Sequence, residues 1–159
     1  MLHARTRTPA PATLALLLLA ALALAPAALA QTPAGDKPKE EPPFHAYKGV
    51  RIGMAAEEAR KLLGNPTDKD DKQDFYSFND KESCQVYYDD TKKVFAVSVT
   101  YLAPEAAPAP KTVLGAEADA KQDGSLYKML RFPKVGYWVS YTRTAGESPM
   151  TLVTMQKIQ

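Results

Sequence analysis

The residues that could carry out covalent chemistry in this chain are one cysteine, Cys84, and two histidines. A cysteine nucleophile needs a neighbouring base, and His45 is the only histidine beyond residue 30. Strand alternation places Cys84 on one face with Val86 and Tyr88, which is typical of a small buried residue. We therefore predict no catalytic residue. An unpaired cysteine in an oxidising compartment can form an intermolecular disulfide, so Cys84 is a candidate for one.

A cluster of carboxylates raises the question of a metal site, and its members are Asp68, Asp70, Asp71 and Asp74. A calcium loop begun at Asp68 requires an oxygen ligand at its fifth position, glycine at its sixth and glutamate at its twelfth. The chain has Lys72, Gln73 and Asn79 there. Interleaved lysines favour a solvated, self-compensated turn, with a weak adventitious calcium site as the alternative. We predict no metal and, in the absence of a phosphate-binding or hydrolase motif, no cofactor and no enzymatic activity.

Aromatic side chains near the C-terminus are the candidate partner-binding residues: Tyr137, Trp138 and Tyr141. On a strand, Tyr137 and Tyr141 share one face, and Trp138 lies on the other with small polar neighbours. One of these faces must be core. The other would present an aromatic anchor to a partner.

A helix must precede the strands, because small and apolar residues recur at three- and four-residue spacing through GMAAEEARKLLGNP. The expected apolar face holds Met54, Ala55, Ala59, Leu62 and Leu63. Glu57 and Lys61 are expected to pair across one turn on the polar face. Gly64 is expected to end the helix in a left-handed conformation, and Pro66 prevents continuation.

Alternating segments predict antiparallel strands at 75–78, 84–89, 94–102, 125–132, 136–143 and 150–158. In the third strand, alternation places Phe95, Val97, Val99 and Tyr101 on one face. The predicted fold class is α+β, with a short N-terminal helix packed on an antiparallel sheet.

The two halves of the domain share short segments. KLLG at 61–64 and TVLG at 112–115 lie 51 positions apart, as do Tyr76 and Tyr127. This spacing indicates a degenerate tandem repeat of one helix-plus-hairpin unit. Three prolines in 103–110 predict a crossing loop without helix or strand, so the second unit is expected to have lost its helix.

The first 30 residues have the pattern of a secretory signal peptide. Arg5 and Arg7 precede the apolar run from Leu14 to Leu24, and the small residues at 28–30 predict cleavage before Gln31. The apolar stretch is too short to span a bilayer, so no stable membrane insertion is expected after cleavage. We predict a periplasmic or secreted protein.

Three segments follow from these boundaries: the signal peptide 1–30, a proline-rich flexible linker 31–43, and a single α+β domain 44–159. Without Arg5 and Arg7 the chain holds eighteen basic and eighteen acidic residues. A chain without net charge has no overall field that attracts nucleic acid, so no nucleic-acid partner is expected.

The run from Gly49 to Pro66 resembles the signature of the SmpA/OmlA (BamE) family, in which Gly53-Met54 precedes a helix that ends at Leu63-Gly64 and is followed by Pro66. The resemblance implies an envelope protein with a helix packed on an antiparallel sheet, as in the wider group similar to the β-lactamase inhibitor protein, and binding without catalysis. The chain lacks the cysteine that anchors BamE proteins to lipid and has additional strands, so assembly-machine membership is not implied.

The preferred function is an exported, non-catalytic binding or scaffold module of the bacterial cell envelope that contacts an envelope or extracellular protein. The alternatives are a secreted inhibitor of an extracellular enzyme and a small secreted enzyme. The second alternative has no acid, base and nucleophile set to support it.

Overall fold

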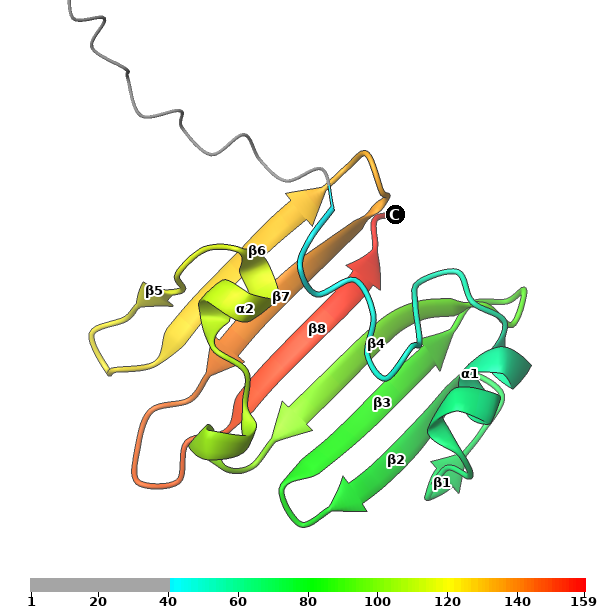
Figure 1. Cartoon of the computed structure of the whole chain (residues 1–159), viewed down its shortest axis with the longest axis horizontal. Helices are drawn as coiled ribbons and strands as arrows, with labels where there is room; N and C mark the ends of the chain where they lie inside the picture. The colour runs from blue at the N-terminus through cyan, green and yellow to red at the C-terminus, as the bar shows by residue number, and fades with distance from the viewer. Residues whose placement is uncertain (1–40) are drawn as a thin grey trace, which may run out of the picture. The chain divides into compact units, whose positions relative to one another are not determined.

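The computed structural model describes residues 41–159, which form one α+β domain (Figure 1). The predicted signal peptide and residues 31–40 of the predicted linker lie outside the described residues. Residues 41–43, also predicted to be linker, contact the domain. Pro42 is buried, and Pro43 lies against Gly115.

The domain is built on one antiparallel sheet of eight strands in the order β1-β2-β3-β4-β8-β7-β6-β5. All six predicted strands are present, with bounds within two residues of expectation. They are β2 (Gln73–Asn79), β3 (Glu82–Tyr88), β4 (Val94–Tyr101), β6 (Leu126–Phe132), β7 (Tyr137–Arg143) and β8 (Thr151–Lys157). Two-residue strands that the sequence did not predict lie at the edges: β1 (Asp68–Lys69) and β5 (Asp119–Ala120).

Both α-helices, α1 (Ala56–Leu63) and α2 (Pro110–Leu114), lie over the same face of the sheet, which we call the covered face (Figure 1). The core lies between these helices and alternate residues of the strands, and it includes Val86, Val99, Val139 and Val153, none of which is exposed. The opposite face, which we call the open face, has neither α-helix above it.

Helix α1 packs with a narrower apolar stripe than the sequence predicted. Ala56 and Ala59 are buried and Leu63 packs against the core, whereas Ala55 is exposed and Leu62 is 51% exposed. Ala55 is the residue before the helix, and the following amide of Ala56 donates to the carbonyl of Lys92. This bond ties the start of the helix to the β3–β4 turn.

A β-bulge changes the predicted faces of β4. Tyr87 pairs with Ala96 and Tyr88 pairs with Val94, so β4 has one extra residue at this point. The prediction that Phe95 shares a face with Val97 is therefore wrong. Val94 occupies the core, and Phe95 lies beside Tyr87 with 6.0 Å between ring centroids.

The loop at 103–110 is not free of helix, which corrects a second prediction. A 3-10 turn spans Pro104–Ala106, and α2 begins at Pro110, where proline suits the first helical position because that amide has no partner within the helix. Gly115 ends α2 in a left-handed conformation with φ 74° and ψ 5°. The second half has therefore kept a short helix.

The two halves share the element order helix, two-residue strand and three long strands. Gly64 and Gly115, 51 positions apart, both follow a helix with positive φ. Tyr76 and Tyr127, however, do not occupy equivalent places in the two halves, because Tyr76 is buried on the covered face and Tyr127 is exposed. The predicted match between them is therefore wrong. By its place in the register, Tyr127 corresponds to Phe75, because each pairs with the first residue of the short edge strand.

Within residues 41–159, no helix is long and apolar enough to cross a membrane.

Gly64 is the position at which we predict a purely conformational loss of stability. Its φ of 85° and ψ of −158° lie outside the predicted left-handed helical region, in a region that is essentially restricted to glycine. No atom lies within 4 Å of an added Cβ, so a side chain meets strain and no clash. We expect Gly64→Val to lower the free energy of unfolding in urea by about 1–3 kcal/mol.

The matched control is Lys61→Ala on the exposed side of the same helix, which we expect to change stability by less than about 0.5 kcal/mol. Equal stability of the two variants would contradict the glycine-specific conformation.

Candidate functional site

The three candidate partner-binding aromatics are divided between the two faces of the sheet. Tyr137 and Tyr141 are 7% and 3% exposed and belong to the core. This confirms that one face of the strand is core, and it excludes Tyr137 and Tyr141 as partner-binding residues. Trp138 lies between them in sequence and on the open face, where it is half-buried.

The open face is poor in charge. The six long strands each contribute three half-buried or exposed side chains to it, and only one of these, Arg131, is charged, although 24% of the whole chain is charged. The other positions are Gln73, Phe75, Ser77, Ser83, Gln85, Tyr87, Phe95, Ser98, Thr100, Tyr127, Met129, Trp138, Ser140, Thr142, Leu152, Thr154 and Gln156. Depletion of charge together with enrichment in aromatic residues is typical of the centre of a protein interface.

An aromatic row crosses this face. Register pairs connect Tyr87 through Ala96 to Gln156, then to Trp138 and Arg131, over five adjacent strands. The bulge adds Phe95 beside Tyr87. Neighbouring strands lie about 4.8 Å apart, so the row offers two separated aromatic groups with an amide between them.

A polar row lies beside the aromatic row. The hydroxyls of Ser98 and Thr154 are 2.9 Å apart, and the Gln85 amide donates to the Gln73 side-chain oxygen over 3.0 Å. These bonds satisfy the polar groups within the sheet and hold their side chains in place. The hydroxyl and amide groups of this row are uncharged and can hydrogen-bond to water when no partner is bound.

Two hollows lie at the end of the aromatic row and share Tyr87 and Phe95. The larger, of about 600 Å³, is bounded by Lys72, Asp90 and the C-terminal residues 157–159. The smaller, of about 230 Å³, extends along the face toward Ser98 and Thr154. Sequence reasoning missed Tyr87 and Phe95, although alternation with buried Val86 and Tyr88 could have placed Tyr87 here.

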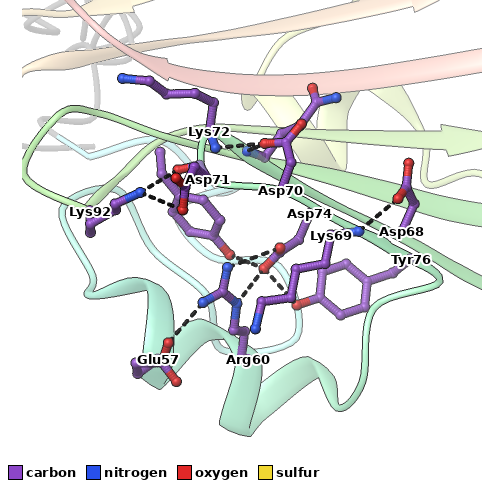
Figure 2. Close-up of polar contacts among 12 residues, drawn as sticks. Glu57, Arg60, Asp68, Lys69, Asp70, Asp71, Lys72, Asp74, Tyr76 and Lys92 are labelled. Atoms are coloured by element: carbon purple, nitrogen blue, oxygen red, sulfur yellow. Dashed lines mark hydrogen bonds and ion pairs between the residues drawn. The ribbon is translucent and has the colours of Figure 1, made fainter.

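A buried carboxylate connects α1 to the sheet (Figure 2). Asp74 on β2 is fully buried, and the Arg60 guanidinium donates to both of its oxygens at 2.8 and 3.1 Å. The Tyr88 hydroxyl donates to Asp74 at 2.6 Å, and Tyr76 contributes a longer bond of 3.4 Å. Asp74 therefore does not belong to the solvated turn that the sequence predicted for it.

The environment of Asp74 favours its ionised form. Burial raises the pKa of this carboxyl, but the hydrogen bonds from Arg60 and Tyr88 and the charge of Arg60 outweigh burial and lower it below its ordinary value of 3.8. Burial and the same carboxylate raise the pKa of Tyr76 to about 12. The cluster is enclosed and internally satisfied, so it stabilises the fold and is not open to a substrate.

The remaining aspartates of the predicted turn are exposed, as expected. Asp70 accepts the backbone amides of Lys72 and Gln73, and Asp71 pairs with Lys92 at 3.0 Å. In the part of the chain that the structure describes, no three His, Cys, Asp or Glu side chains are grouped to hold a metal. Glu57 pairs with Arg60, three residues on, and not with Lys61 as predicted.

Cys84 lies in the core. Its side chain is 1% exposed, and burial raises the pKa of the thiol to about 12. A thiol in this state supplies no thiolate at neutral pH, and His45 is exposed. The buried sulfur argues against the intermolecular disulfide predicted for Cys84.

No family model matches the chain, and no curated protein matches it. The solved structure of a DUF4309 family protein, YjgB from Bacillus subtilis, is similar with a TM-score of 0.48 and 10% identity over 70% of this chain and 86% of that chain. The resemblance to the SmpA/OmlA (BamE) family stays a prediction from the sequence.

Replacement of Asp74 tests the buried cluster. Asp74→Asn removes the charge that compensates Arg60, whose side chain is 18% exposed, and we expect a loss of about 3 kcal/mol in unfolding free energy at pH 7. The pKa of Asp74 in the folded protein is below its ordinary value of 3.8. Ionised Asp74 therefore stabilises the fold at a pH above that ordinary value, and this stabilisation is lost as the pH falls through the folded pKa.

The free energies of unfolding of the wild type and of Asp74→Asn should therefore be closer to each other when urea unfolding is repeated at pH 3. Asp71→Asn, which changes an exposed aspartate, is the control and should cost less than about 1 kcal/mol. A pH-independent difference would contradict an ionised Asp74.

Alkylation tests the burial of Cys84. We expect N-ethylmaleimide to leave the native thiol unmodified and to add one label after unfolding in urea, as read by intact mass. The control is Ser83→Cys in a Cys84→Ser background, which moves the thiol to the open face and should be labelled in the native state. Equal labelling rates of the two native proteins would overturn the assignment of Cys84 to the core.

Proposed function

We propose that the protein is an exported, non-catalytic binding or scaffold module of the bacterial cell envelope that binds a protein partner through its open sheet face. The observation that carries the proposal is the single charge among the eighteen side chains that the six long strands present on that face, combined with the aromatic row of Tyr87, Phe95 and Trp138. The other charges that the strands place on this face lie on the two-residue edge strands.

The chemistry of the face supports a macromolecular partner. Aromatic residues are common energetic centres of interfaces, and the half-buried rings of this face still have apolar area that a partner can remove from water. Trp138 retains an indole N–H donor. It lies between Arg131 and Gln156 in the register, and the hydrogen-bonding groups of these side chains can exchange bonds with a partner's backbone. The face spans six long strands, so a protein partner can lie across it without rearrangement of the sheet.

An inhibitor of an extracellular enzyme is the alternative that the same face supports. The hollows beside Tyr87 and Phe95 are open enough to receive side chains of a partner. The two functions differ in the nature of the partner and in whether its activity falls on binding.

We also propose that the two halves derive from one duplicated helix-plus-hairpin unit. The common element order and the shared spacing of the helix-ending glycines support this. Duplication would account for the width of the sheet and of its open face, because each half supplies three of the six long strands.

Site-specific photo-crosslinking in the native envelope tests the binding function. A benzoylphenylalanine is placed at Ser140 or Thr154, in the centre of the open face, or at the exposed controls Lys61 and Glu147. We expect one discrete crosslinked protein from each open-face position and none from the controls. A crosslinked enzyme whose activity falls when purified domain is added would select the inhibitor function.

Crosslinks from the controls alone, or none from Ser140 and Thr154, would contradict binding through the open face.

A further inference from the structure

The two edges of the sheet differ in how far their outward backbone groups are already hydrogen-bonded. At the β2 edge, the amide of Thr67 donates to the carbonyl of Phe75, and the Thr67 hydroxyl accepts the amide of Ser77 at 3.0 Å. At the β6 edge, β5 pairs only with Leu126 and Tyr127. The remainder of β6 extends beyond the end of β5.

The register identifies the backbone groups that point outward from β6. Ser125 accepts the amide of Lys121, and Tyr127 pairs with Asp119, so alternate residues starting at 125 turn their backbone toward β5. Met129 and Arg131 continue this alternation and turn their N–H and C=O groups to the same side. Within residues 41–159, no backbone group pairs with them there.

Two features that commonly protect an edge strand, a β-bulge and a proline, do not occur in β6. The strand pairs with β7 over seven residues without a register shift, and it contains no proline. Met129 is 41% exposed beside the free groups. This edge is a regular, partly apolar template for another strand.

The charge of the edge selects the kind of strand that fits. Residues 124–136 contain three basic side chains and no acidic one. Lys128 is paired with Asp119 at 3.0 Å. Arg131 is exposed and has no acidic partner among the residues of the described domain.

We propose that the free edge of β6 at Met129–Arg131 binds an extended segment of a protein partner, which adds a strand to the sheet and carries an acidic side chain beside Arg131 and an apolar one beside Met129. The backbone groups supply the pairing, and the two side chains supply the selectivity. This inference does not depend on the proposed function of the open face.

Binding of synthetic peptides tests the proposal. The probe is a blocked peptide of about seven residues, the length of a typical strand, in which valine and glutamate take turns at every second position and threonines lie between them. One face of this strand then carries both valine and glutamate, as Met129 and Arg131 require, because these two residues share one face of β6. Its counterpart has lysine for glutamate. We expect the acidic peptide to bind at least about ten-fold more tightly by fluorescence anisotropy. Hydrogen exchange at the amides of Met129 and Arg131 should slow when it binds.

The decisive variant is Met129→Pro, which removes one outward N–H and leaves the pairing with β7 intact. Its matched control, Met129→Thr, keeps that N–H and removes the apolar side chain. We expect the proline variant to weaken binding about ten-fold more than the threonine variant. Should the proline variant not fold, the exchange measurement on the wild type decides alone.

No binding, equal binding of the two peptides, equal effects of the two variants or unchanged exchange at Met129 and Arg131 would each overturn the proposal. Pairing of two copies of the domain through β6 in place of the peptide would overturn the assignment of the partner. Photo-crosslinking at Ser140 and Thr154 reads a different surface, so failure here leaves that result unaffected.

Discussion

The structure depends on burial of one face of a single sheet. Eight antiparallel strands form one layer, and both α-helices together with the ordered segment before α1 lie on the same side of it (Figure 1). Valines on that side exclude water, and this burial supplies most of the driving force for folding. The opposite side is consequently released from any role in the core. A surface that takes no part in the core usually carries many charged residues, but the six long strands present a single arginine among eighteen side chains on this one.

Attachment of α1 to this layer relies on polar as well as apolar contacts. The helix has eight residues and buries only two alanines completely, which is too little apolar area to hold it firmly. Arg60 extends from it to Asp74 on β2, where Tyr88 completes the hydrogen bonding. A bidentate pair fixes direction as well as distance, so the ion pair sets the position of the helix. The open face is unaffected by this arrangement, because Asp74 and Tyr88 both point to the covered side.

Sequence periodicity predicted the strands, because alternation survives in any strand with one buried face. Periodicity could not choose the buried face of β7, since aromatics occur on both, and so Tyr137, Tyr141 and Trp138 all stay candidates for partner binding until burial excludes the two tyrosines. A bulge inverts the expected side of Phe95, and no short pattern reports a bulge. Asp74 was grouped with its acidic neighbours, although its period-two relation to Tyr76 pointed to the core. Helix α2 was missed because proline was read as a breaker and not as a first residue.

Binding of a partner through the open face can be tested by hydroxyl-radical footprinting of the protein in the cells that produce it and after purification. If the open face binds a partner, Tyr87, Phe95 and Trp138 are oxidised more slowly in the cells than in the purified domain. Leu62, which is 51% exposed on α1, should react equally in both states. Unchanged oxidation of Trp138, or protection confined to Leu62, would contradict the account.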